Sequence, residues 1–148
     1  MAGVVCVNRY DQTYIDACRA SIECQVDTYH ALAATGARLS GAAATRFEKA
    51  LEAFEPVFFN NLVLALDHFF ANRSRSLEKK DGNPVNEVRV LARSLTAHAG
   101  RLVGDTQIRL DPALSVLGYR LGEEIALCEA QFLRLAKAYF AEIEARYR

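Results

Sequence analysis

The stretch 57-VFFNNLVLALDHFF-70 is apolar on nearly every side of a helix. A helix that is hydrophobic all round is buried inside a protein, so this segment predicts the central helix of the fold. Pro56 stands directly before it and can either begin a new helix or kink one that continues from upstream. The near-continuous apolar surface of residues 57–70 also favours association into a homodimer.

Upstream of this segment, the spacing predicts a helix over residues 10–35. Apolar residues recur there at steps of three and four, which is typical of an amphipathic helix. The stretch 35-TGARLSG-41 ends that helix, and a second helix begins near Ala42. The predicted inner stripe of the first helix is Ile15, Cys18, Ile22, Val26, Tyr29 and Leu32.

Downstream, 71-ANRSRSLEKKDGNP-84 is polar and mostly basic and ends in turn residues. Runs of charge are usually solvated, so one interpretation of 73-RSRSLEKKDGN-83 is a solvated loop. Asn83 then caps a helix whose first position is Pro84. That helix runs to about His98, and Gly100 ends it.

The segment 108-IRLDPALSVLGYRLGEEIALC-128 contains Asp-Pro, two glycines and short apolar alternations. It predicts a loop with a small β-hairpin at 119-YRLGEEIAL-127, with Gly122 at the tip. Residues 129–147 predict a strong final helix. The expected fold is therefore mainly α, an up-and-down bundle of four to five helices with a small β-hairpin before the C-terminal helix, in one domain over 1–148.

The composition limits the classes of function that fit this chain. Lys and Arg total 18 and Asp and Glu total 18. This balance argues against bulk electrostatic binding to nucleic acid or a membrane, so any anion site is local. No export signal or membrane span is visible, which predicts a cytoplasmic protein with reduced thiols. The four cysteines form no CxxC pair, and we interpret them as small core residues: Cys6, Cys18, Cys24 and Cys128.

The helix over 84–98 carries the residues with the most chemistry. At about 100° per residue, Arg93 points away from the apolar stripe and His98 lies on its edge. Arg89 stands one turn before Arg93, and Asn86 roughly one turn before that. Arginines at i and i+4 repel by a few tenths of a kcal/mol. A solvated face tolerates this, and a face that binds a phosphate would also produce it.

The stretch 93-RSLTAHAG-100 resembles the R-x4-H signature of the HEPN superfamily, which consists of small all-α domains. The surrounding sequence is also similar: 83-NPVNEVRVLARS-94 before the motif, then a glycine, the turn 119-YRLGEEIAL-127 and a final amphipathic helix. The upstream 62-LVLALDHFFANR-73 resembles the buried helix of such domains. The resemblance covers roughly residues 57–148.

The resemblance implies a metal-independent endoribonuclease, without a cofactor, that works as a homodimer. His98 would act as general base or acid, since histidine titrates near neutral pH. Arg93 would hold the phosphate and stabilise developing charge, and Ser94 would orient one of the two. Arg89 and Asn86 would extend the anion site. Apart from the resemblance, Arg73 and Arg75 of 72-NRSRS-76 could contact phosphate near the end of the bundle.

Other HEPN-like domains are inactive and serve as RNA-binding or protein-interaction modules. Many are encoded beside a nucleotidyltransferase or another antitoxin, so the resemblance also implies a toxin–antitoxin or defence role with such a partner. A purely structural or regulatory dimer is a further interpretation.

A metal site is a rival interpretation of another class. His30, His68 and His98 are the only histidines and fall on three different predicted helices. Three imidazoles that converge can bind a divalent ion, and Asp67 and Glu78 could add ligands. The alternative is that these histidines are polar residues at the edges of the bundle.

Overall fold

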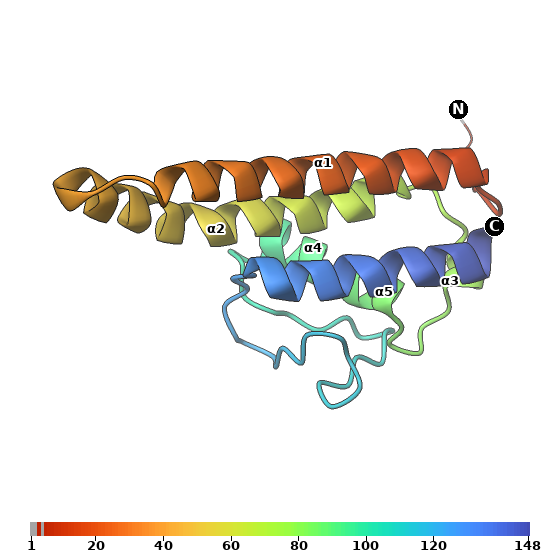
Figure 1. Ribbon diagram of the computed structural model, residues 1–148. Helices are drawn as coiled ribbons and strands as arrows, with labels where there is room; N and C mark the ends of the chain where they lie inside the picture. The colour runs from red at the N-terminus through yellow and green to blue at the C-terminus, as the bar shows by residue number, and fades with distance from the viewer. Residues whose placement is uncertain (1–2, 4) are drawn as a thin grey trace.

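A computed structural model of the protein describes residue 3 and residues 5–148. The described chain is built of helices, which confirms the mainly α prediction. Figure 1 shows α1 and α2 as a long antiparallel hairpin, with α5 lying along its lower side and α4 behind α5. The elements in chain order are α1 (Gln12–Gly36), α2 (Gly41–Phe69), α3 (Arg75–Glu78), α4 (Pro84–Ala97) and α5 (Glu129–Tyr147).

Helix α2 is the centre of the fold, as the apolar stretch predicts. It runs without a break through Pro56, so this proline lies inside a continuous helix. The side chains of Phe59, Val63 and Leu66 are fully buried. The hydroxyl of Tyr139 on α5 donates to the carbonyl of Leu66 at 3.0 Å.

Three helices of the same chain, α1, α4 and α5, pack against α2. They bury one face of it, including Phe59 and Leu66, whereas Val57 is 56% exposed and Leu64 and Ala65 line an open groove. Helix α2 is therefore central but not buried all round, and the homodimer stays a prediction.

The hairpin of α1 and α2 extends past the start of α5 (Figure 1). Between residues 31 and 54 the only buried residue is Gly36. A Cβ at Gly36 would overlap the ring of Phe47, so the glycine lets the two helices approach closely. Leu32, expected on the inner stripe, is half exposed because no third helix covers this part of the hairpin.

The segment between α4 and α5 contains no local β-hairpin, so that prediction is wrong. Residues 100–102 instead pair with residues 122–125 in a single antiparallel bridge, Arg101 with Glu124. The amide of Leu102 donates to the carbonyl of Glu123 at 2.9 Å, and the amide of Ile125 to that of Gly100 at 2.8 Å. The sequence pattern suggested pairing between near neighbours, whereas Ile125 is drawn into the core, where its carbonyl accepts from Asn60 of α2 at 2.8 Å.

A buried carboxylate fastens the same segment to α4. Glu87 accepts the amides of Val116 and Leu117 at 2.8 and 2.9 Å. Burial raises the pKa of Glu87, while these two backbone hydrogen bonds lower it in part. The loop therefore has one fixed point on α4 between its two ends.

The prediction that all the cysteines are core residues is wrong for three of them. Cys18 is buried on the inner face of α1, whereas Cys6, Cys24 and Cys128 are exposed, and all four are free. Six residues of helix turn the chain by about 600°, which puts Cys24 on a different face from Cys18.

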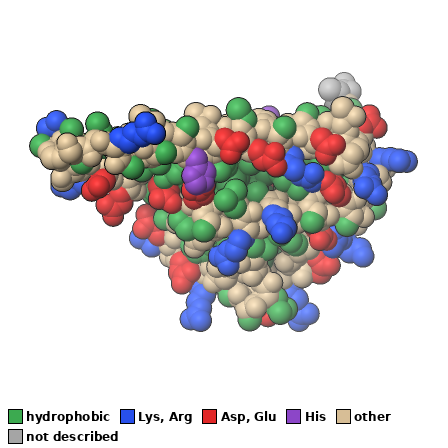
Figure 2. All heavy atoms as spheres, viewed as in Figure 1, with side chains coloured by type: hydrophobic (Ala, Val, Ile, Leu, Met, Phe, Trp, Pro, Cys, Tyr) green, Lys and Arg blue, Asp and Glu red, His purple; other side chains and the backbone are tan. Residues whose placement is uncertain are grey.

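Apolar side chains of α1 and α5 meet in a shallow groove between the two helices (Figure 2). Lys, Arg, Asp and Glu side chains surround it on that face. None of the described helices combines the length and the apolar character that crossing a membrane requires.

Candidate anion-binding site

Helix α4 presents the motif arginine to solvent. The side chain of Asn83 caps the helix by accepting the amides of Val85 and Asn86, and Pro84 follows as predicted. With Val85, Val88 and Leu91 turned into the core, Arg93 lies on the opposite face. Its side chain is 63% exposed, which confirms the expected direction.

Arg93 stands at an open groove between α2 and α4, which we call the α2–α4 groove. Its volume is about 620 Å³. The only ion pair of Arg93 within the described chain is a long one, 3.4 Å from Nη1 to Oδ2 of Asp105. Apolar and polar side chains both line the groove: Leu64, Ala65, Ala71 and Ala92 with Asp67, His68, Arg89, Arg93 and Thr96.

His98 ends α4 and does not line this groove. Its backbone amide donates to the carbonyl of Ser94 at 3.1 Å. Ala99 and Gly100 then take positive φ angles of 51° and 74°, so the chain leaves the helix at the predicted place. Within the described chain no hydrogen bond or ion pair joins His98 to Arg93, as expected for side chains five positions apart on a helix, which diverge by roughly 140°.

Ser94 has a structural task that its predicted role did not include. It is fully buried, and its hydroxyl accepts the amide of Val103 at 3.0 Å. This hydrogen bond holds the segment after α4 against the helix. Ser94 is therefore not placed to orient Arg93 or His98 from within the same chain.

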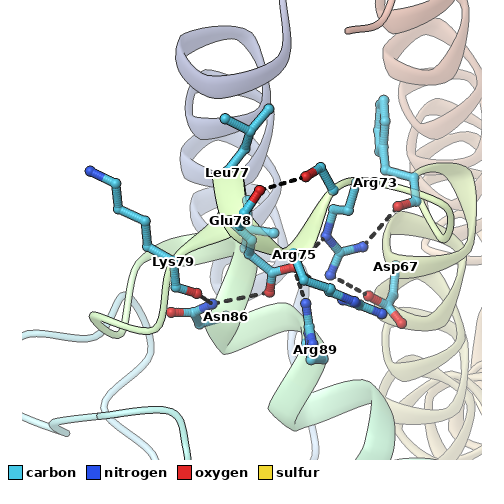
Figure 3. A network of polar contacts seen from close by, with 12 residues as sticks. Asp67, Arg73, Arg75, Leu77, Glu78, Lys79, Asn86 and Arg89 are labelled. Atoms are coloured by element: carbon cyan, nitrogen blue, oxygen red, sulfur yellow. Dashed lines mark hydrogen bonds and ion pairs between the residues drawn. The ribbon is translucent and has the colours of Figure 1, made fainter. Parts of the chain in front are cut away.

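A second group of charges lies beside the groove, centred on Glu78 (Figure 3). The Glu78 carboxylate is buried, and its Oε2 accepts from three arginines. Arg73 and Arg75 both donate at 3.0 Å, and Arg89 also donates. Asn86 donates to Oε1 at 3.0 Å. We call these five residues the Glu78 cluster.

The cluster corrects in part the interpretation of residues 73–83 as a solvated loop, because Arg73 and Glu78 are buried although most residues of the stretch are exposed. Arg73 is buried, and besides Glu78 it donates to Asp67 at 3.1 Å and to the carbonyl of Phe70 at 3.0 Å. Asn86 is buried as well and also donates to the carbonyl of Lys79 at 3.0 Å. Both residues were predicted to contact phosphate, but their donors are engaged inside the protein.

Arg75 and Arg89 are the members of the cluster that reach the surface. Their side chains are 55% and 25% exposed. The Nε of Arg89 is buried without a hydrogen-bond partner in the described chain. Burial, followed by the charge of Arg73, lowers the pKa of Arg75. Glu78 and Asp67 together pair with three guanidinium groups, which leaves positive charge at the surface.

The three histidines lie in separate places. His30 on α1 pairs with Glu129, His68 lines the α2–α4 groove, and His98 ends α4. Across residues 3 and 5–148, no three His, Cys, Asp or Glu side chains gather in a way that could hold a metal ion. The three-histidine metal site therefore has no geometric basis in this part of the chain.

Comparison with known proteins adds no relative. A scan against protein-family models, a search of curated proteins and a search of solved structures each find nothing that matches this chain.

Proposed function

We propose that the protein is a HEPN-like, metal-independent endoribonuclease that acts as a homodimer. The observation that supports the proposal most is the contrast among the arginines. Arg73 is fully engaged inside the protein, whereas Arg93 of the motif is largely exposed on a groove with one long polar contact. An exposed arginine beside a groove is suited to grip a phosphate with its planar fork.

The chemistry follows the resemblance of 93-RSLTAHAG-100. The RNA 2′-oxygen attacks the adjacent phosphorus as the bond from phosphorus to the 5′-oxygen breaks. His98 takes the proton of the 2′-hydroxyl or supplies one to the leaving 5′-oxygen. Arg93 stabilises the charge that develops on the phosphate. The products are a 2′,3′-cyclic phosphate and a 5′-hydroxyl.

The separation of Arg93 from His98 on one helix makes a second copy necessary. In a two-fold dimer, Arg93 of one copy would act with His98 of the other, which gives two composite sites. Toxin–antitoxin pairing with an antitoxin or a nucleotidyltransferase belongs to the same proposal.

Cleavage of single-stranded RNA in the presence of EDTA tests the proposal. His98→Ala should slow cleavage by roughly 10²–10⁴-fold, the usual worth of general acid–base catalysis. Arg93→Ala should lose a comparable factor, and Arg93→Lys should restore little because the fork is gone. The matched controls are His30→Ala and Arg134→Ala, a histidine on α1 and an exposed arginine on α5. Unchanged cleavage in both motif variants, or cleavage that stops when metal is removed, contradicts the proposal.

Mixing the two inactive variants tests the composite site. In a dimer of one Arg93→Ala copy and one His98→Ala copy, one site lacks both groups and the other keeps both. Random exchange should therefore restore roughly a quarter of the wild-type rate, since half of the dimers are mixed and each has one intact site. A mixture as inactive as its components, or light scattering that finds only monomer at tens of micromolar, contradicts the dimeric mechanism.

A non-catalytic RNA-binding module is the second candidate. It is favoured by Ser94, whose hydroxyl is used to hold Val103, and by the divergence of Arg93 from His98. Wild-type protein that binds RNA but never cleaves it would select this candidate.

A further inference from the structure

A small surface hollow next to the α2–α4 groove has no role in the chemistry proposed above. Its volume is about 50 Å³, which suits one small oxyanion rather than a nucleobase. We call it the basic hollow. Its polar lining consists of Arg75, Lys79, Lys80 and Arg89 with Asp105 and Gln107.

We propose that the basic hollow binds a phosphodiester of an RNA strand at a position separate from the cleavage site. This inference rests on the proposed function only in taking RNA as the occupant of the neighbouring groove. Four cations line the hollow, and two carboxylates are near, Asp105 and the buried Glu78. Since the whole chain is neutral, this excess of positive charge is a local feature.

Both carboxylates are engaged by arginines, so they do not neutralise the two lysines of the hollow, of which Lys80 donates to the neutral Gln107 at 2.6 Å. Glu78 is buried under Arg75 and Arg89 and accepts from both. Asp105 accepts the amide of Gln107 at 2.7 Å within its own loop and faces Arg93 at 3.4 Å. Neither carboxylate therefore balances Lys79 or Lys80.

The backbone at the edge of the hollow is held in an unusual conformation. Lys79 has φ 61° and ψ −172°, a region that is essentially restricted to glycine. Its carbonyl accepts from Asn86, and the carbonyl of Lys80 accepts the amide of Arg109 at 3.1 Å. These hydrogen bonds fix the segment that places the two lysines beside Arg75 and Arg89.

Continuity with the groove identifies the occupant as a strand rather than a single nucleotide. Arg89 lines both the basic hollow and the α2–α4 groove. Arg93 follows it by one helical turn, about 6 Å along the axis. A strand with one phosphate at Arg93 can therefore place another phosphate of the same chain in the hollow.

The experiment measures binding of a labelled 12-nucleotide single-stranded RNA with 2′-O-methyl sugars, by fluorescence anisotropy at several salt concentrations. The methyl groups prevent attack by the 2′-oxygen, so only binding is observed. The double variant Lys79→Gln/Lys80→Gln removes two exposed cations of the hollow. The matched control Arg38→Gln/Arg46→Gln removes two exposed cations at the far end of the α1–α2 hairpin.

The hollow variant should raise Kd by about tenfold. It should also reduce the slope of log K against log salt by about 0.7, because one phosphate of the strand is no longer neutralised. The control should change Kd by less than about twofold. Equal losses of affinity in both variants would mean that net charge alone matters and would overturn the inference, as would no loss in either. Lys80→Glu should weaken binding at least as much as the double variant while keeping Lys79.

Two further results distinguish RNA-strand binding in the hollow from binding of free phosphate and from the nuclease proposal. Inorganic phosphate added at constant ionic strength should compete only weakly with the RNA. If millimolar phosphate raises the Kd of the wild type to that of the double variant, the hollow is a site for free phosphate. That result would overturn the proposal that it binds an RNA strand. RNA that is bound through the hollow but never cleaved would reject the nuclease and keep this inference. If the RNA is cleaved but the double variant binds it as tightly as the wild type does, the nuclease proposal stands and this inference is overturned.

Discussion

The Glu78 cluster and the α2–α4 groove place the same residue type in opposite surroundings. In the cluster, Arg73 is buried, and its donors reach two carboxylates and a backbone carbonyl. At the groove, Arg93 is largely exposed and meets one carboxylate at the long distance of 3.4 Å. The two arginines lie 20 positions apart in the sequence, and Arg89 belongs to both regions. The cluster therefore serves the fold, whereas the Arg93 guanidinium at the groove is largely free to contact a ligand.

The largest effect is expected from removing the centre of the cluster. Glu78→Ala should lower the free energy of unfolding by about 3–5 kcal/mol, because it leaves the buried Arg73 and the partly buried Arg89 without this carboxylate. Phe140→Ala, a deletion on the inner face of α5, should cost a similar 3–5 kcal/mol. Chemical denaturation of both variants measures the two losses in free energy of unfolding. A loss below about 1 kcal/mol for Glu78→Ala would show that the cluster is not a structural unit.

A smaller effect of opposite sign is expected at Lys79. Lys79→Gly should raise the free energy of unfolding by about 1–2 kcal/mol, because glycine adopts φ 61° and ψ −172° without strain. The gain would be reduced in part by the extra freedom of glycine in the unfolded chain. Thermal unfolding measures it, and Lys80→Gly, at a residue without positive φ, is the matched control. A lower melting temperature for Lys79→Gly than for Lys80→Gly would contradict the argument.

The smallest effect is expected at the groove. Arg93→Ala should change the free energy of unfolding by less than about 0.5 kcal/mol, as is usual for an exposed side chain. The same denaturation experiment should show Arg73→Ala to be far less stable, because that change uncovers Glu78 and Asp67. Similar losses of stability in the two variants would remove the distinction between a structural and a ligand-facing arginine.

The regular helices could be predicted from the sequence, because their limits are local. The predicted helix over 129–147 agrees with α5, and the one over 84–98 differs from α4 by one residue. Asn83 and Pro84 mark the start of α4, and Gly100, two positions after His98, marks its end. The outward direction of Arg93 follows from helical spacing alone.

The loop structure and the Glu78 cluster depend on contacts between residues far apart in the sequence, which residue spacing does not reveal. In 71-ANRSRSLEKKDGNP-84 the charge run gave no sign that Arg73 and Glu78 are buried, because their partners include Asp67, Asn86 and Arg89. The local hint is that arginines stand five and three positions before Glu78. The predicted hairpin failed for the same reason, since residues 122–125 pair with residues 100–102.

That distant pairing has a consequence for how the chain can change its length. It joins residues 100–102 to residues 122–125, so the part between them closes on itself while α4 and α5 keep their places. Leu114, in this part, is almost fully exposed. Doubling the length of a closed loop adds only about 0.6 kcal/mol to the cost of closing it. The protein can therefore accept insertions around Leu114 over evolution, and acquire new surface there, without moving the helix that carries Arg93.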